Sequence, residues 1–429
     1  MREAGLDDQV INLLSSQIDH LAAGSTGHIP EASIDPVTEV ETMPSATGVD
    51  PEALSRTALI KLNGGLGTSM GMNTPKSLLP VTAGRTFLDI IITQVLAARR
   101  AYGVTMPLVL MNSFRTEQPT LEFCDRYPEL AVPGVSLSMR QNQIPKLTQE
   151  LLPVSWPENP ELEWCPPGHG DLYATLVSSG VLDELLEAGM SYALVSNADN
   201  LGAFPDPGLA RWFAGTGAVM ALEVCERTEA DRKGGHLARR RRDGKLILRE
   251  IAQVPSHEIA EFQNIERHRY FNTNNIWLNL RMLRDHLDED GFVAMPIIRN
   301  IKPVDPTRPD TPKVIQVETG MGTAIESFDS ARAIEVPRSR FLPVKTTNDL
   351  FFMRSDLVTE TDEGRIVAKT DRRPIIDLDP RFFARIDDFN ERCEHVPSLA
   401  RVESLTVRGD LTFPEGLELS GNVRLEGTV

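Results

Sequence analysis

The chain has 429 residues, of which 41% are hydrophobic and 24% are charged, and its formal net charge is −17. This length allows two or three domains with a large core, and the negative charge argues against nucleic acid or an anionic membrane as the main partner. Four scattered cysteines without a C-x-x-C pair, no apolar leader and no run of about 18 apolar residues indicate a cytoplasmic protein without a disulfide framework or zinc site.

The first fifty residues predict a helix followed by a linker. Apolar side chains recur at helical spacing over residues 7–22. Residues 24–51 are rich in Gly, Pro, Ser, Thr and acids, a composition typical of a linker. The alternative is an arm packed against the core or a partner.

The stretch IKLNGGLGTSMGMNTPKSLLP, residues 60–80, is the most informative part of the chain. Glycine accepts positive φ and leaves room for a ligand, so its four glycines predict a nest of backbone N–H groups that binds an anion. Lys76 adds a full positive charge at the end of the loop. The spacing matches neither a Walker A loop nor the G-x-G-x-x-G dinucleotide fingerprint. We interpret it as a phosphate loop of a third kind, with an ordinary surface loop as the alternative.

The segments after this loop predict an α/β sheet. Residues 86–102 predict a helix that ends at Gly103, and residues 107–111 predict an apolar strand. Strand, loop, helix and strand begin a sheet with parallel strands, in which ligands bind beyond the carboxyl ends of the strands. Further on, Gln141 belongs to an amide triplet suited to the edge of a nucleobase. A polar strand end is the alternative there.

Two later stretches place candidate site residues at the ends of elements. In WCPPGHGDLY, Gly168 and His169 precede a predicted helix, whose N-terminus favours a phosphate. A structural histidine is the alternative. In YALVSNADNL, an apolar strand ends at Asn197 and Asp199, where a carboxylate brings Mg²⁺ to the phosphates of a nucleotide. An Asx-rich turn is the alternative.

The middle of the chain predicts further strands and a hairpin. Four arginines over residues 239–242 precede Asp-Gly, which indicates a solvated hairpin rather than a nucleic-acid site. Residues 245–254 predict a strand that carries Glu250. In YFNTNNIWLNL, residues 270–280, clustered asparagines suit sugar hydroxyls, with turn formation as the alternative.

The last third of the chain predicts a basic cluster and a change of architecture. VIQVETGMGTAIESF predicts a strand and then a helix. We interpret Arg338, Arg340 and Lys345 as cations gathered at a phosphate site, with a solvated basic face as the alternative. Residues 377–393 predict a helix, and the following β-rich units, punctuated by glycines, predict a small β-solenoid. A β-meander is the alternative.

These residues together predict nucleotidyl or phosphoryl transfer on a nucleoside triphosphate. Moreover KLNGGLGTSMG followed by PKS, then CPPGHGDLY, SNADNLG, LREIAQVP, FNTNNIW and SRFLPVKTTNDL resemble, in this order, the eukaryotic-type family of UTP–glucose-1-phosphate uridylyltransferases, or UDP-glucose pyrophosphorylases. The resemblance covers about residues 55–429. It implies an α/β fold with a Rossmann-like, GT-A-like mixed-sheet nucleotidyltransferase core and a C-terminal left-handed β-helix. We therefore expect an N-terminal helix and acidic linker over residues 1–54, a catalytic domain over 55–373 and the β-helix over 374–429.

The resemblance implies that UTP and α-D-glucose 1-phosphate become UDP-glucose and pyrophosphate, with Mg²⁺ bound by Asp199 and with Lys345 and Lys76 as the catalytic cations. The residues that it implies for UTP are Leu62, Asn63, Gly64, Gly65, Lys76, Gln141, Gly168, Asp199 and Lys345. Those that it implies for glucose 1-phosphate are Gly64, Gly65, His169, Asn197, Ala198, Asp199, Gly235, Glu250 and Asn274. The family commonly has a bulkier apolar residue where this chain has Ala198.

Two other activities stay open as alternatives. One is a related pyrophosphorylase for UDP-N-acetylhexosamine or other UDP-sugars, although FNTNN and SRFLPVKTT favour glucose. The other is a non-catalytic nucleotide-sugar sensor, against which the intact Lys76, Asp199 and Lys345 argue. We expect small-molecule substrates and no nucleic acid or membrane partner. The family assembles through its C-terminal repeats, which here stop at Val429, so a homo-oligomer of open size is expected.

Overall fold

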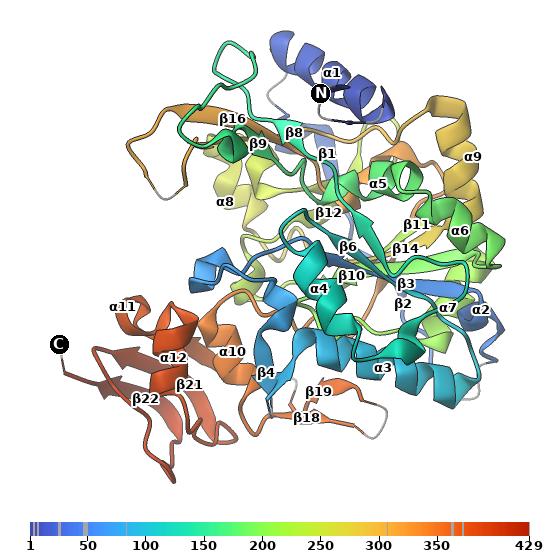
Figure 1. Cartoon of the computed structure of the whole chain (residues 1–429). Coiled ribbons are helices and arrows are strands. Elements are labelled where there is room, and N and C mark those ends of the chain that lie inside the picture. Colours follow the sequence, from blue (N-terminus) through green and yellow to red (C-terminus); the bar gives the residue numbers. More distant parts are fainter. Residues whose placement is uncertain are drawn as a thin grey trace.

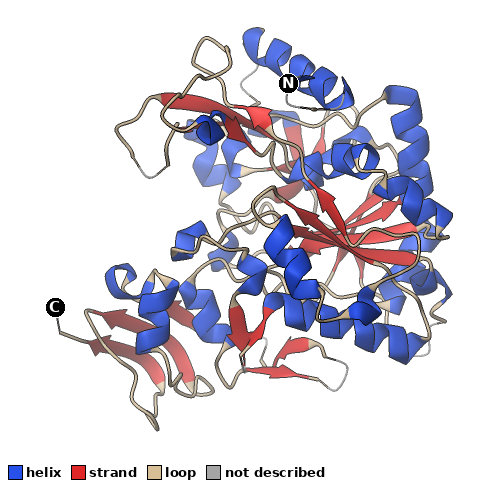
Figure 2. Cartoon of the chain, in the orientation of Figure 1, coloured by secondary structure: helices blue, strands red, loops and turns tan. Residues whose placement is uncertain are grey.

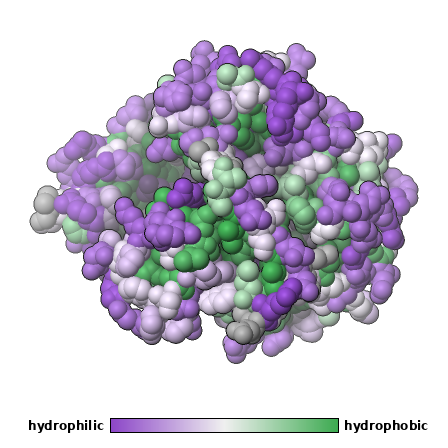
Figure 3. Space-filling model, turned by 90° about the horizontal axis from the view of Figure 1, so that it is seen from above, coloured by the Kyte–Doolittle hydropathy of each residue, from purple (hydrophilic) through white to green (hydrophobic). Residues whose placement is uncertain are grey.

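In the computed structural model, the described residues form a large mixed sheet with helices on both faces and a smaller parallel sheet near the C-terminus (Figures 1 and 2). The described residues are 1–2, 5–6, 8–24, 27–45, 50–82, 84–306, 308–361, 364–370 and 373–428. Among them, no helix combines the length and the apolar character that crossing a bilayer requires. Figure 3 shows that hydrophilic side chains surround the hydrophobic ones that are visible from above.

The central sheet follows one path with a branch. Its path is β2 (Glu41–Thr42), β17 (Arg332–Glu335), β11 (Met220–Glu226), β14 (Tyr270–Asn279), β10 (Tyr192–Asn197), β3 (Thr57–Asn63), β6 (Leu108–Asn112) and β7 (Ser138–Arg140). Its branch is β12 (His236–Arg240) with β13 (Leu246–Arg249) and β1 (Ile34–Pro36). Strands β10, β3, β6 and β7 are parallel, so the predicted parallel sheet is confirmed. Their carboxyl ends meet at one edge, because parallel strands end on the same side of a sheet.

Two hydrophobic clusters cover the two faces of this sheet, because successive side chains of a strand point to opposite faces. Leu59 packs into the cluster that contains α3, whereas Ala58 and Ile60 pack into the cluster that contains α5, α6 and α9. The helices are α1 (Asp8–Ala22), α2 (Glu52–Ser55), α3 (Phe87–Tyr102), α4 (Glu117–Cys124), α5 (Leu172–Ser178), α6 (Val181–Glu187), α7 (Pro207–Thr216), α8 (Ile259–Phe262), α9 (Leu280–Asp290), α10 (Thr347–Met353), α11 (Pro380–Phe383) and α12 (Ile386–Arg392).

The N-terminal segment is a packed arm rather than a free linker over its described residues. After α1, the short 3₁₀ helix η2 (Glu31–Ser33) leads into β1, which pairs with β12, and β2 then pairs with β17. The packed-arm alternative therefore holds for these residues. Residue 7 of the predicted helix, and residues 25–26 and 46–49 of the predicted linker, lie outside the described part of the chain.

In the C-terminal segment, the single helix that we predicted over residues 377–393 is two short helices, α11 and α12, and a strand precedes them. Strand β20 (Ile375–Asp377) precedes α11 and α12, and it pairs in parallel with β21 (Val402–Arg408), which pairs in parallel with β22 (Gly421–Glu426). Parallel pairing excludes a meander among these strands, because neighbouring strands of a meander run antiparallel. These strands lie apart from α1 in Figure 1.

Four strand pairs flank the central sheet. They are β4 (Pro80–Thr82) with β5 (Arg85–Thr86), β8 (Ile144–Pro145) with β9 (Trp164–Cys165), β15 (Ile298–Pro303) with β16 (Lys313–Glu318), and β18 (Val358–Glu360) with β19 (Ile366–Ala368). The segment after β16 is not the α-helix that we predicted but the 3₁₀ helix η11 (Met321–Ser327). This difference matters for the site, because η11 packs against the loop that carries His169.

Candidate active site

The glycine-rich loop begins where β3 ends. Its left-handed residues are Gly67 and Gly71, with φ of 44° and 74°, and not Gly64 or Gly65. Gly64 has a different role, because it lets the backbone approach Gln141: a Cβ there would lie 3.1 Å from the side-chain amide atoms of Gln141. The loop thus brings its backbone directly against the side chain that was predicted to contact the base.

A cavity of about 290 Å³ lies at the carboxyl ends of the parallel strands. The predicted residues that line it are Leu62, Asn63, Gly64, Gly65, Lys76, Gln141, Gly168, His169, Asn197, Ala198 and Asp199. Sequence reasoning did not single out Ser77, Met111 and Pro166, which also line it. Strand register explains the convergence, because Asn197 lies beside Leu62 in the parallel pair of β10 and β3.

Asp199 is held between two ammonium groups on the cavity wall. Its Oδ2 lies 2.7 Å from Nζ of Lys76 and 3.1 Å from Nζ of Lys345. Burial alone would raise the pKa of this carboxyl, but the two lysines outweigh burial and hold the pKa below its usual range. Asp199 is therefore ionised at neutral pH.

His169 faces the same cavity in a defined tautomer. Its Nδ1 accepts a hydrogen bond of 2.9 Å from the backbone N–H of Met321, so the proton of the neutral ring is on Nε2. The exposed surface of the ring faces the cavity, whose walls limit the water around it. This desolvation and the charge of Lys345 lower the pKa of His169 to about 4. At neutral pH the ring offers an N–H donor without a positive charge.

We predicted that Arg338, Arg340 and Lys345 gather at a phosphate site, and this prediction is wrong for the two arginines. Arg338 pairs with Asp231, with 2.8 Å between the charged atoms. Arg340 is buried and donates two hydrogen bonds, of 2.8 and 2.7 Å, to the buried carboxylate of Glu223. Only Lys345 of the three reaches the cavity residues.

The buried pair of Glu223 and Arg340 instead fixes the segment that carries Lys345. The carbonyl of Arg340 accepts hydrogen bonds from the side chains of Asn200 and Asn275, and the Asn200 side chain accepts one from Leu342 N–H. These contacts join the 340–345 segment to the loop after β10 and to β14. They anchor Lys345 to the same framework as Asp199.

The three residues predicted for the sugar lie together but not on the wall of this cavity. A Cβ on Gly235 would come within 2.5 Å of the Glu250 carboxylate, so a larger residue there would displace that carboxylate. The carbonyl of Gly235 accepts a 3.0 Å hydrogen bond from Asn272 N–H, and the Asn272 side chain donates to Asn274 Oδ1. Asn274 has a φ of 58°, at a bulge in β14. Glu250 follows β13 rather than lying within a strand, and burial raises its pKa.

The segment Thr319–Thr323 links the two groups of residues, and sequence reasoning missed it. Gly320 lies close to the His169 ring, and a Cβ on Gly322 would lie 2.9 Å from the Asn272 side-chain nitrogen. A Cβ on Gly168 would lie 2.5 Å from the carbonyl oxygen of Thr319. Gly168 therefore admits a neighbouring backbone segment, and it also lines the cavity. The repeated glycines of TGMGT were the signal for this close packing.

Asp199 fits the kind of metal site that a nucleotide completes. Within the described residues, no three side chains of His, Cys, Asp or Glu converge to form a metal site. Mg²⁺ commonly takes one or two carboxylates together with substrate phosphates and water. One ionised carboxylate beside a phosphate loop is compatible with that arrangement.

A larger hollow, of about 1470 Å³, lies between the N-terminal arm and the arginines of the β12–β13 hairpin. Each of these arginines already has a carboxylate partner: Asp243 and Glu326 for Arg240, Asp35 for Arg241, and Asp243 for Arg242. The hairpin prediction for this stretch is confirmed. We assign the active site to the smaller cavity, because the candidate catalytic side chains converge there.

Comparison with known proteins shows the family to which the chain belongs. The family model for UTP--glucose-1-phosphate uridylyltransferase matches residues 12–420. The chain belongs to this family. A uridylyltransferase of that name from Solanum tuberosum is 40% identical over 416 residues, which cover 94% of this chain and 85% of the relative.

Solved structures of uridylyltransferase relatives have the same fold. UDP-glucose phosphorylase from Trypanosoma brucei has a TM-score of 0.91 and 41% identity, with 99% of this chain and 93% of the relative covered. A mutant UDP-glucose pyrophosphorylase from Leishmania major, in complex with UDP-glucose, has a TM-score of 0.93 and 42% identity, with 99% and 93% covered. The mixed α/β architecture predicted from the sequence is thereby confirmed.

Proposed function

We propose that the protein is a uridylyltransferase that converts UTP and α-D-glucose 1-phosphate to UDP-glucose and pyrophosphate. The observation that carries this proposal is the placement of Asp199 between Lys76 and Lys345, on a cavity that the glycine-rich loop opens onto. Family membership supplies the substrates, and the cavity supplies the groups that their chemistry needs.

Charge repulsion is the main obstacle to this reaction, because one anion must attack another. The phosphate oxygen of glucose 1-phosphate is already ionised, so it needs no general base. Lys76 and Lys345 lie on either side of one point, within 3.1 Å of the same carboxylate oxygen. We infer that they hold the sugar phosphate and the triphosphate in line and stabilise the charge that moves onto pyrophosphate.

Mg²⁺ fits this site through Asp199, and when bound it supplies further neutralisation of the phosphate charge. We assign Asn197 and Ala198 to the floor beside it, since both line the cavity. Leu62, Asn63, Gly64, Gly65, Gln141 and Gly168 surround the rest of the cavity and are proposed to hold the uridine and its phosphates.

The sugar is assigned to the neighbouring group of Gly235, Glu250 and Asn274. Together they offer a carbonyl, a carboxylate and an amide, which can pair with hydroxyl donors and acceptors. His169 lines the cavity, and its Nε2–H can donate to the sugar phosphate. A specific pocket for glucose, rather than for a bulkier N-acetylhexosamine, is the version of this proposal that the sequence motifs favour.

Three finer proposals concern the rest of the chain. We propose that residues 374–429 begin a left-handed β-helix, which the parallel pairing of β20, β21 and β22 supports. We propose the boundaries 1–54, 55–373 and 374–429 for the three segments. A cytoplasmic site of action and a homo-oligomer that assembles through the last segment complete the proposal.

The decisive experiment is pyrophosphorolysis: UDP-glucose and pyrophosphate are supplied with Mg²⁺, and UTP formation is measured. We expect UTP from the wild-type protein. Binding of UDP-glucose without any UTP would instead support a nucleotide-sugar sensor. Initial rates of the forward reaction with glucose, galactose and N-acetylglucosamine 1-phosphates test the sugar, and a preference for the N-acetyl sugar would overturn the assignment to glucose.

A further inference from the structure

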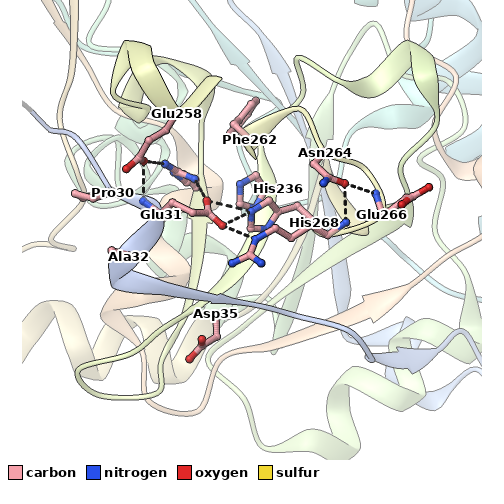
Figure 4. A network of polar contacts seen from close by, with 12 residues as sticks. Pro30, Glu31, Ala32, Asp35, His236, Glu258, Phe262, Asn264, Glu266 and His268 are labelled. Carbon is pink, nitrogen blue, oxygen red and sulfur yellow. Dashed lines mark hydrogen bonds and ion pairs between the residues drawn. The ribbon is translucent and has the colours of Figure 1, made fainter. Parts of the chain in front are cut away.

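Glu31 of the N-terminal arm lies at the centre of a dense polar network, although it is far from the cavity in sequence (Figure 4). Its carboxylate accepts hydrogen bonds of 2.5 Å from Arg249 and 2.7 Å from Arg267, and it lies 3.0 Å from Nε2 of His268. Its backbone N–H donates to Glu258, which also accepts from Arg249. Glu31 therefore connects the N-terminal arm with Arg249 of β13 and with the segment that carries Arg267 and His268.

This network has a strong electrostatic reason to form. The side chain of Arg249 is fully buried, and its charged partners are the carboxylates of Glu31 and Glu258. A buried guanidinium without a partner is costly, so Arg249 requires these carboxylates. Burial would raise the pKa of Glu31, but Arg267, His268 and Arg249 outweigh it and lower the pKa.

Arg249 immediately precedes Glu250, one of the residues that we assign to the sugar. In the β12–β13 pairing, Arg249 lies opposite His236, which immediately follows Gly235. Gly235 and Glu250, which we assign to the sugar, are thus each next in the chain to one member of the paired residues His236 and Arg249. Whatever fixes Arg249 and His236 also fixes the positions of Glu250 and Gly235.

The arm holds the other side of Glu250 as well. The N–H of Ile29 donates a 2.7 Å hydrogen bond to the carbonyl of Gln253, and the side chain of Gln253 accepts one from Glu250 N–H. Strand β1 then continues along β12, with the buried Ile34 packed on Ala238 and Ile247. Glu250 is therefore flanked by two attachments to the same arm.

We propose that Glu31 is a positioning residue for the sugar-phosphate subsite, which acts through Arg249 on the Gly235–Glu250 pair. The N-terminal arm is then part of the apparatus that recognises the sugar. This inference rests on the proposed function, because it assigns Gly235 and Glu250 to the sugar. Glu31 itself touches neither substrate nor reacting atoms.

The test is a kinetic comparison of Glu31→Gln with the wild type, with UTP and glucose 1-phosphate varied separately. We expect the KM for glucose 1-phosphate to rise about tenfold, as for a small displacement of a contacting group, and the KM for UTP to change less than twofold. Asp35→Asn is the matched control, because Asp35 lies on the same arm in an exposed pair with Arg241. We expect both KM values of this control to be unchanged.

A second measurement separates positioning from simple stabilisation. In a Glu250→Gln background, Glu31→Gln should raise the KM for glucose 1-phosphate less than twofold, because residues that act through one another are not additive. An equal rise in both backgrounds, or a lower melting temperature with both KM values unchanged, would overturn the inference. Glu31→Asp, which keeps the charge, takes the place of Glu31→Gln if that variant does not fold.

These outcomes also distinguish the inference from the proposed function. A wild-type protein that forms no UTP in pyrophosphorolysis contradicts the proposed function itself. An active wild type whose sugar kinetics are insensitive to Glu31→Gln contradicts only the role of Glu31.

Discussion

The ammonium of Lys76 lies 2.7 Å from Oδ2 of Asp199, although 123 positions separate the two residues. The cation of the phosphate loop and the proposed metal ligand thus neutralise each other in this structure. When a triphosphate binds, its oxygens can replace Asp199 as partners of the lysine. The carboxylate is then available to a cation that arrives with the nucleotide.

Lys345→Ala should reduce turnover strongly. Its side chain is more than half exposed, but its ammonium lies 3.1 Å from Asp199, at the point where we expect the reacting phosphates to meet. Loss of one oriented charge-stabilising group costs about 2–3 kcal/mol of transition-state stabilisation. The measurement is kcat/KM in pyrophosphorolysis, with Lys313→Ala, an exposed lysine on β16, as the control. Equal kcat/KM for Lys345→Ala and wild type would refute the catalytic role.

Asp199→Asn should change the dependence on Mg²⁺. Asparagine keeps the shape of the side chain but loses its charge, so more Mg²⁺ is needed for half-maximal activity, by about tenfold or more. Without Mg²⁺, UTP should bind this variant more tightly, because Lys76 and Lys345 no longer have a competing carboxylate partner. Calorimetry with UTP checks this second effect. An unaltered Mg²⁺ titration would contradict the assignment of Asp199 to the metal.

His169 should not contribute to the pH dependence of activity near neutrality. Its pKa is lowered to about 4, so the ring stays neutral between pH 5.5 and 8. The ratio of kcat/KM for wild type and His169→Gln should therefore be constant over this range. It should fall only as the pH approaches 4, when protonation of Nδ1 ends its acceptance of the Met321 N–H. A break in the ratio near pH 6.5 would show an unperturbed histidine.

Lys61 should make the folded state less stable at neutral than at alkaline pH. Its ammonium is completely buried behind the cavity, where it donates 2.8 Å hydrogen bonds to Ser196 and to the carbonyl of Ala203. Burial is the main cause that lowers its pKa from 10.5 to about 7. Above pH 7 the folded protein releases this proton while the unfolded chain keeps it until about pH 10.5, so stability rises with pH in this window.

The measurement is the free energy of unfolding of wild type and Lys61→Met from pH 7 to pH 10. The free energy of unfolding of the wild type minus that of Lys61→Met should grow by about 1.4 kcal/mol per pH unit through the middle of this window. Groups that titrate in both proteins cancel in the difference. A difference that does not vary with pH would mean that Lys61 stays charged in the folded protein.

Elements with local signals were predictable from the sequence. Helix α3 begins at a capping box formed by Thr86 and Asp89, and it ends at Gly103 with a φ of 65°. Both signals lie within the helix or in the residues directly next to it in the chain. The parallel strands before and after it were predictable for the same reason, since their apolar runs are short and end at Asn63 and Asn112.

Contacts between distant segments were not predictable in this way. The arginines of the basic cluster were read as free charges, because Glu223 is 117 positions away from Arg340 and no local pattern points to it. Likewise, no local pattern shows that Gly168 packs against the carbonyl of Thr319, which belongs to another part of the chain. A glycine shows that something comes close, but it does not show what.

The hairpin that carries Gly235 and Glu250 joins the central sheet at one register position, His236 beside Phe271 of β14. Several residues assigned to the nucleotide lie instead at the carboxyl ends of the consecutively paired parallel strands, such as Leu62 and Asn63 at the end of β3 and Gln141 directly after β7. Selection of the sugar and chemistry on the phosphates therefore rest on separately attached units. Replacing this hairpin together with the N-terminal arm is therefore a route to enzymes that activate other sugars, while the residues that act on the phosphates stay unchanged.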